Sequence, residues 1–175
     1  MRLSDLATLS LTYEPQGQTL EGPMPGGFHH LELERRLGRG ELVYARATQA
    51  VMTYAPQRGI GLRPQATAPR AAVGVDILSR LVVLPVPCRV VWTAEEPGRT
   101  GFGYGTLAGH VESGEEGFLV ERRGEDVYAV VRAYSTPAWT LARLAGPLLW
   151  RGQQLAARGY LRAMQRAADG HAHAG

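Results

Sequence analysis

The sequence contains no lysine and no asparagine, and Cys88 is its one cysteine. All 19 basic residues are therefore arginines. A single cysteine excludes an intramolecular disulfide bond and a metal site built from cysteines. A nucleophilic thiol needs an electropositive, partly exposed setting, and the neighbours of Cys88 supply only one charge, from Arg89. We therefore interpret Cys88 as a buried strand residue.

Long hydrophobic segments are also absent. The longest apolar run, Leu81 to Cys88, contains two prolines and falls far short of the ~20 residues that a membrane-spanning helix needs. The N-terminal segment has an early Asp5 and no uninterrupted apolar stretch, which is typical of mature sequence rather than of a signal peptide. We expect a cytoplasmic protein that does not insert into membranes.

Charge and composition exclude further classes. The net charge of +3 is spread over the chain, and the arginine pairs Arg35-Arg36 and Arg122-Arg123 are too few to predict a nucleic-acid surface. The avoidance of lysine, asparagine and isoleucine indicates a GC-rich bacterial genome. No dinucleotide fingerprint, Walker loop or established metal motif is present, so we expect no cofactor and no metal.

At 19.0 kDa the chain fits one domain. We assign residues 1–168 to that domain and residues 169–175, which include His171 and His173, to a flexible tail.

The pattern of elements predicts an antiparallel sheet with helices. Residues 28–37 alternate in polarity, and residues 41–54 show helical spacing that Pro56 is expected to end. Short strands separated by turns are expected at 60–63, 72–78, 81–94, 102–110, 115–122 and 127–134. Ser135-Thr136-Pro137 reads as the start of a long C-terminal helix that reaches about Ala168 and is interrupted at Gly146-Pro147.

The strand over 102–110 separates two kinds of residue. Phe102, Tyr104, Thr106 and His110 share one face, and glycines occupy most of the other. Because glycine contributes no packing, the bare face predicts close approach by another element or a sharp bend. The face with Phe102, Tyr104, Thr106 and His110 is a candidate ligand-binding surface.

A polar cluster follows, and we expect Glu112-Ser113-Gly114 to form a tight turn. His110, Glu112, Glu115 and Glu116 are candidate catalytic residues, because an imidazole and carboxylates can exchange protons with a substrate. The alternative is a structural hairpin whose carboxylates pair with Arg122, Arg123 or Arg132.

Small residues mark one face of the C-terminal helix. Gly152 and Gly159 each cost roughly 1 kcal/mol of helix propensity relative to alanine. They indicate either tight packing on the sheet or space left for a ligand, and the sequence leaves both readings open.

The segments YGTLAGHVESGEEGF and AYSTPAWTLARLAGPLLWRGQQLAARGYLRAM resemble uncharacterised protein family 0548, a bacterial and plant family also catalogued as a domain of unknown function. The resemblance extends over most of the chain, through Tyr13-x-x-x-Gly17 and Leu37-Gly38-x-Gly40. The family is similar to the helix-grip superfamily of START domains, birch-pollen-allergen proteins and polyketide cyclases. This resemblance implies an α+β fold in which a curled antiparallel β-sheet grips a long C-terminal helix around a cavity.

Three functions follow as hypotheses. The first is binding of a small hydrophobic molecule, such as a lipid, isoprenoid or polyketide, between sheet and helix. The second is a cyclase-, hydrolase- or isomerase-like enzyme that uses His110 with Glu112, Glu115 or Glu116. The third is an interaction module, in which a homodimer pairs through an exposed strand. The sequence leaves open whether the loop from Pro15 to Gly27 closes a pocket.

Overall fold

The computed structural model describes residues 1–81, 84–138 and 146–170. Its elements are the 3₁₀ helix η1 (Leu3–Thr8), the strands β1 (His29–Arg39), β2 (Gln65–Ala66), β3 (Asp76–Leu81), β4 (Leu84–Glu96), β5 (Arg99–Thr106), β6 (Glu112–Arg123) and β7 (Asp126–Pro137), and the helices α1 (Glu41–Met52), α2 (Ala55–Gly59) and α4 (Gly146–Ala168).

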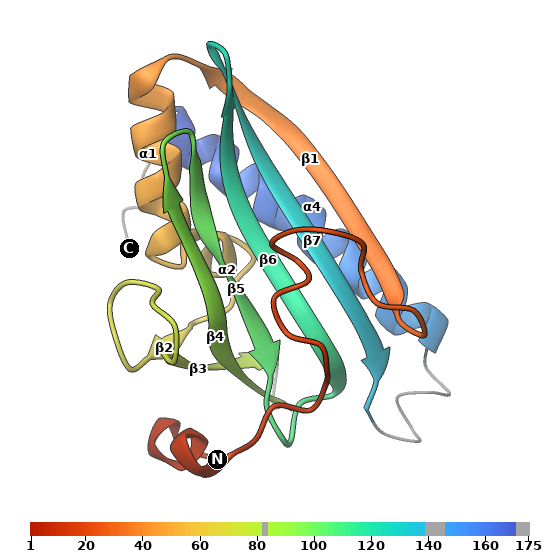
Figure 1. The fold of residues 1–175 in the computed structure, drawn as a ribbon. Helices are drawn as coiled ribbons and strands as arrows, with labels where there is room; N and C mark the ends of the chain where they lie inside the picture. The colour runs from red at the N-terminus through yellow and green to blue at the C-terminus, as the bar shows by residue number, and fades with distance from the viewer. Residues whose placement is uncertain (82–83, 139–145, 171–175) are drawn as a thin grey trace.

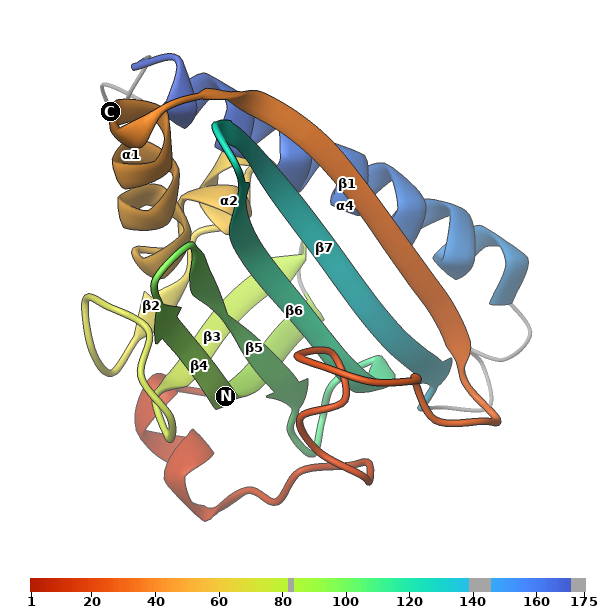
Figure 2. The same cartoon turned by 45° about the horizontal axis from the view of Figure 1, so that its top comes forward.

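The strands form one antiparallel sheet in the order β1-β7-β6-β5-β4-β3-β2. Helix α4 runs along one face of this sheet, and α1 and α2 lie beside the C-terminal half of α4 (Figures 1 and 2). The predicted α+β architecture, a curled antiparallel sheet with a long C-terminal helix, is therefore confirmed. We call the face toward α4 the inner face and the other the outer face.

The inner face divides into a filled part and a hollow part. Toward the C-terminal end of α4, Phe118 is fully buried and its ring lies 5.0 Å from that of Tyr160. Met164 of α4 and Val51 of α1 are likewise completely buried. Apolar burial of this kind contributes about 25 cal/mol per Å² removed from water, so this part of the core holds the helix on the sheet. The part beneath the N-terminal half of α4 is hollow.

The glycines of β5 are covered on the outer face by large side chains. A Cβ at Gly103 would lie 2.2 Å from Nε1 of Trp92, and one at Gly105 would lie 2.3 Å from the hydroxyl oxygen of Tyr13. Only glycine leaves room for these rings. The predicted close approach of another element is therefore confirmed.

The N-terminal segment crosses the outer face of the sheet, opposite α4 (Figure 1). Its backbone reaches β7 through the carbonyl of Gly22, which accepts a hydrogen bond from Arg132. Most of the loop from Pro15 to Gly27 is thereby tied to the face that does not carry the helix. It does not lie over the hollow part of the inner face.

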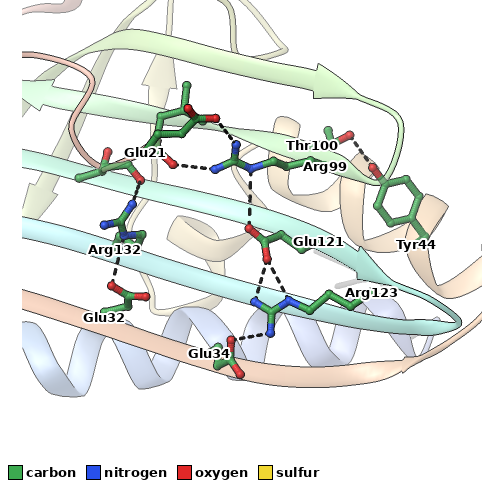
Figure 3. Close-up of polar contacts among 11 residues, drawn as sticks. Glu21, Glu32, Glu34, Tyr44, Arg99, Thr100, Glu121, Arg123 and Arg132 are labelled. Atoms are coloured by element: carbon green, nitrogen blue, oxygen red, sulfur yellow. Dashed lines mark hydrogen bonds and ion pairs between the residues drawn. The ribbon is translucent and has the colours of Figure 1, made fainter. Parts of the chain in front are cut away.

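Ion pairs connect side chains of the outer face (Figure 3). Arg123 of β6 pairs with Glu121 of the same strand at 2.8 Å and with Glu34 of β1 at 3.0 Å, and Arg132 of β7 pairs with Glu32 of the neighbouring β1 at 3.3 Å. Arg122 pairs with Glu41 of α1 at 2.6 Å. Partly exposed pairs of this kind contribute about 0–1 kcal/mol each. These arginines do not bond to Glu112, Glu115 or Glu116, so the alternative in which they neutralise the polar cluster is wrong.

Several predicted boundaries are also wrong. Residues 60–63 form a turn followed by irregular chain rather than a strand. Helix α1 ends at Met52 because Tyr54 adopts a left-handed conformation with φ of 62°. Pro56 lies in the first turn of α2, so it begins a helix instead of ending one.

The expected helix start at Ser135-Thr136-Pro137 is the end of β7. Pairing with Gly114, Ser113 and Glu112 of β6 keeps this segment extended. For the same reason Glu112 to Gly114 open β6 instead of forming a turn, and the chain reverses at Ala108-Gly109. The helical reading of residues 139–145 lies outside the described residues, and α4 begins at Gly146-Pro147, where a kink was expected.

Candidate functional site

A cavity of about 310 Å³ lies between the inner face and the N-terminal half of α4. Strands β5, β6 and β7 form its floor, and α4 covers it from Gly152 to Tyr160. Its apolar side wall comes from the segment after α2 and from β3 and β4, with Ile60, Leu62, Leu81 and Val86. Gly152 and Leu81 are exposed, so the cavity reaches the surface beside these residues.

The polar side chains of the cavity come mainly from β6, one of the strands of its floor. Glu112, Gly114 and Glu116 share one face of the strand, because alternate residues point to the same side. At ~3.3 Å per residue, the Cα atoms of Glu112 and Glu116 are roughly 13 Å apart. Both carboxylates lie on the inner face of the sheet, at two positions along the cavity. We call the position of Glu112 the outer position and that of Glu116 the inner position.

Glu116 occupies the inner position beside Tyr104. The hydroxyl of Tyr104 donates to Oε2 of Glu116 at 2.6 Å, and Tyr160 of α4 also lines the cavity. Burial raises the pKa of Glu116 to about 7, and the negative charge of Glu112 adds to this shift, against the stabilising hydrogen bond from Tyr104. Glu116 therefore changes its protonation state near neutral pH.

Glu112 occupies the outer position, next to α4. The side-chain amide of Gln153 donates to Oε2 of Glu112 at 2.9 Å and to the hydroxyl oxygen of Ser135 at 2.7 Å. Burial raises the pKa of Glu112 to about 7 in spite of the hydrogen bond from Gln153.

His110 closes the polar end of the cavity and is 9% exposed. The backbone N–H of Glu112 donates to Nδ1 of His110 at 2.9 Å, and the backbone oxygen of Glu112 also lies 3.0 Å from Nδ1. Burial lowers the pKa of His110 to about 4. The imidazole is therefore uncharged at neutral pH.

Glu115 does not join this group. Its carboxylate lies on the outer face, where it is 3% exposed. It accepts hydrogen bonds from the hydroxyls of Tyr13 and Tyr134, the backbone N–H groups of Gly17 and Thr19, the hydroxyl of Thr19 and the indole N–H of Trp92. A buried carboxylate with this many donors is a structural anchor for the N-terminal segment.

The structure brings together some of the predicted site residues. Tyr104, Thr106, His110 and Gly152 line the cavity with Glu112 and Glu116. Phe102 is fully buried in the filled core, 5.5 Å from the ring of Phe118.

The two glycines of α4 differ in the space around them. A Cβ at Gly152 would meet no atom within 4 Å, whereas one at Gly159 would lie 2.5 Å from Cγ2 of Ile60. Gly152 therefore leaves open space, and Gly159 permits tight packing.

Sequence reasoning missed Ser135, Gln153 and Tyr160. Gln153 and Tyr160 lie seven residues apart on one helix face, a spacing that could have shown them together. Ser135 was hidden by its interpretation as part of a helix start.

The described residues offer neither a metal site nor a membrane-spanning helix. Within the described part of the chain, no group of three or more His, Cys, Asp or Glu side chains is placed to hold a metal ion. In residues 1–81, 84–138 and 146–170, none of the helices has the length and apolar character needed to cross a membrane.

The curled antiparallel sheet and the long C-terminal helix that it grips define a helix-grip fold. The chain belongs to the family described as a domain of unknown function (DUF1990), whose pattern matches residues 12–163. A UPF0548 protein of Deinococcus radiodurans is 32% identical over 172 residues, which covers 90% of this chain and 87% of that protein.

Solved structures share the fold at low sequence identity. Norcoclaurine synthase from Thalictrum flavum, in complex with dopamine and hydroxybenzaldehyde, has a TM-score of 0.55 and 8% identity, with 95% of this chain and 98% of that chain covered. Human STARD10 has a TM-score of 0.54 and 13% identity, with 91% of this chain and 72% of that chain covered. These similarities establish the fold alone.

Proposed function

We propose that this protein binds a small, mostly apolar molecule, of the lipid, isoprenoid or polyketide kind, between its sheet and α4. The observation that carries the proposal is the cavity of about 310 Å³ beneath the N-terminal half of α4. Pockets of about 300–1,000 Å³ with apolar walls and a few convergent polar groups are typical of small-molecule sites. The part of the core beneath the rest of α4 is filled, so the hollow is local.

The helix supports this proposal through Gly152. A glycine inside a helix costs roughly 1 kcal/mol relative to alanine, and at Gly152 no neighbouring atom requires it. The space beside Gly152 opens toward the surface, which gives a ligand a route into the cavity. The fold neighbour from Thalictrum flavum holds small aromatic molecules, which is consistent with a ligand-binding use of the architecture.

Blocking the cavity tests the proposal. Ala156 of α4 lines it, and Ala156→Phe would place a ring in the space a ligand needs. Ala45 lies on the exposed side of α1, so Ala45→Phe is a control of the same chemistry away from the cavity. Titration with the neutral apolar dye Nile red should give saturable fluorescence for the natural protein and Ala45→Phe. Loss of that signal is expected for Ala156→Phe. If Ala156→Phe binds the dye as well as Ala45→Phe does, the cavity is not the binding site.

The second candidate is an enzyme of the cyclase, hydrolase or isomerase kind. It is favoured by the convergence of His110, Glu112 and Glu116 on one cavity, two of them with a pKa of about 7. Groups that titrate near the working pH are effective proton donors and acceptors. Glu115 has no part in this candidate, because its carboxylate is on the outer face.

Recovery of a bound molecule separates the two candidates. A molecule retained by Glu116→Gln in one chemical form, and by the natural protein in an altered form, supports catalysis. The same form from both proteins supports binding alone. The measurement is liquid chromatography with mass spectrometry of the extracted ligand.

The interaction module was expected to show a filled core and a large apolar surface patch. The core is hollow in its described part, so nothing specific favours this candidate. A homodimer remains a prediction, which size-exclusion chromatography with light scattering tests.

A further inference from the structure

The acidic side chains of the cavity face no cation among the described residues that line it. The described lining contains no arginine, and the chain has no lysine. The arginines nearest in sequence to Glu116, which are Arg122 and Arg123, pair with carboxylates outside the cavity. Glu112 and Glu116 keep part of their surface accessible, but a carboxylate that is largely withdrawn from water and lacks a cation is costly when ionised, because burial removes its hydration.

His110 does not supply the missing charge. It is only 9% exposed, and its Nδ1 accepts a hydrogen bond from the backbone N–H of Glu112. No hydrogen bond within the described residues uses its Nε2. Its lowered pKa of about 4 supports an uncharged ring at neutral pH. At pH values above about 7, where Glu112 and Glu116 ionise, the polar end of the cavity therefore carries negative charge without a compensating positive group in its described walls.

The surroundings of Glu116 fit a cationic group. Tyr104 donates one hydrogen bond to the carboxylate, which leaves most of its capacity of about four acceptor positions for a ligand. Tyr104 and Tyr160 also line the cavity, and a cation within about 6 Å of an aromatic ring face gains further attraction. An ammonium group offers donors and a positive charge, and no acceptor.

We propose that the ligand of this cavity carries a protonated amine that pairs with Glu116 between Tyr104 and Tyr160, with its apolar body against Ile60, Leu62 and Val86. This inference rests on the proposed function, because it names the head group of the molecule bound at the same site. Glu112, at the outer position, attracts the same charge without being the main partner. An anionic head group would be repelled by both carboxylates, and a neutral hydroxyl could donate a hydrogen bond to Glu116 but would bring no opposite charge.

Three probes with one apolar body separate these head groups. Naphthylethylamine, naphthylethanol and naphthylacetate are titrated by calorimetry at pH 8, where Glu116 is mostly ionised and an alkyl amine is protonated. Both head groups can donate to the carboxylate, but only the amine adds an opposite charge, so the amine should bind at least about tenfold more tightly than the alcohol. Naphthylacetate should bind most weakly.

Variants of β6 locate the partner of the amine. Glu116→Gln should weaken binding of the amine about tenfold or more and leave binding of the alcohol within about twofold. Glu112→Gln should weaken the amine less. Glu121→Gln is the matched control, because Glu121 lies on the outer face of the same strand. Retained Nile red binding shows that each variant keeps its cavity.

The outcomes separate the two proposals. Equal affinity for amine and alcohol, tightest binding of naphthylacetate, or an unchanged amine affinity in Glu116→Gln would each overturn the amine head group while Nile red binding upholds the cavity function. Failure of the natural protein to bind Nile red and all three probes would overturn the proposed function itself. A preference for the amine that Glu116→Gln abolishes supports both.

Discussion

Glu115 and Glu116 are adjacent in β6, yet their carboxylates lie on opposite faces of the sheet. Glu115 is hydrogen-bonded on the outer face to the N-terminal segment, and Glu116 is hydrogen-bonded on the inner face to Tyr104. The alternation of a strand produces this separation directly. One carboxylate therefore fixes the fold, and its neighbour faces the cavity.

Replacement of Glu115 by glutamine is expected to destabilise the protein by about 2–4 kcal/mol. The N–H groups of Gly17 and Thr19 point at different oxygens of the carboxylate, so the amide nitrogen of glutamine would face one of them and leave that donor without an acceptor. Buried donors left without an acceptor cost about 1–3 kcal/mol each. Urea denaturation measures the loss.

Glu32→Gln is the control for this change, because Glu32 is a well-exposed acid of the outer face in a weak ion pair. Its free energy of unfolding should stay within about 0.5 kcal/mol of that of the natural protein. Equal stabilities for Glu115→Gln and Glu32→Gln would contradict the anchoring role of Glu115.

Two glycine substitutions should have opposite effects on stability. Gly103→Ala places a methyl group 2.2 Å from the indole nitrogen of Trp92, so it should cost about 1–3 kcal/mol through overpacking. Gly152→Ala meets no atom within 4 Å and should stabilise α4 by up to about 1 kcal/mol. Thermal unfolding of both variants in parallel checks the pair. A neutral result at Gly103 would show that Trp92 does not pack against β5 as described.

The stability difference between Glu116→Gln and the natural protein should depend on pH. The folded state raises the pKa of Glu116 from an ordinary value of 4.5 to about 7, so between these values the folded protein binds more protons than the unfolded chain. Stability of the natural protein therefore falls as pH rises through this window. Glutamine does not titrate, so the variant should gain relative stability from pH 5 to pH 8, by about 1–2 kcal/mol after allowance for solvent in the cavity.

Several groups face Glu116 and enter this comparison: Tyr104 of β5, Tyr160 of α4, Glu112 of β6 and Cys88 of β4. The tyrosine and cysteine pKa values are raised by burial, so these groups stay neutral in the window. Glu112 titrates in the same range, and the double variant Glu112→Gln/Glu116→Gln isolates the contribution of Glu112 to the pH dependence of stability. A stability difference that is constant from pH 5 to pH 8 would contradict the burial of Glu116.

His110→Asn should flatten the acid side of the stability profile. The folded state lowers the pKa of His110 from 6.5 to about 4, so the natural protein loses stability as pH falls through this range. Asparagine offers an oxygen that can accept the N–H of Glu112 in place of Nδ1, and it does not titrate. Chemical denaturation at pH 4.5 and pH 7 measures the change. An unchanged slope would show that His110 is not buried as a neutral ring.

Much of the fold follows from the sequence, because alternation and turn residues are local signals. The pattern from 102 to 106 predicted correctly which residues of β5 share a face. The errors came from residues whose conformation is set by partners distant in sequence. Ser135-Thr136-Pro137 has the chemistry of a helix start, but pairing with β6 keeps it extended.

The site was predictable only in part. Spacing placed Tyr104 and Thr106 on one face, and the structure adds Glu116 through the register of β5 with β6, in which Tyr104 is opposite Glu116. Glu115 looked equivalent to Glu116 because a turn at Glu112 to Gly114 would place both carboxylates near the tip of a hairpin. That β6 instead begins at Glu112 decides which carboxylates enter the cavity, and this depends on pairing that no local pattern specifies.

Native mass spectrometry of protein purified without detergent tests the central claim most directly. The account predicts a reproducible extra mass on the natural protein and on Ala45→Phe, and its absence from Ala156→Phe, in which the cavity is filled. Incubation with a lipid and isoprenoid extract should restore the extra mass to protein that has lost it. Apo mass alone after that incubation, or equal loading of Ala156→Phe, would contradict the proposal that the space between sheet and helix holds a ligand.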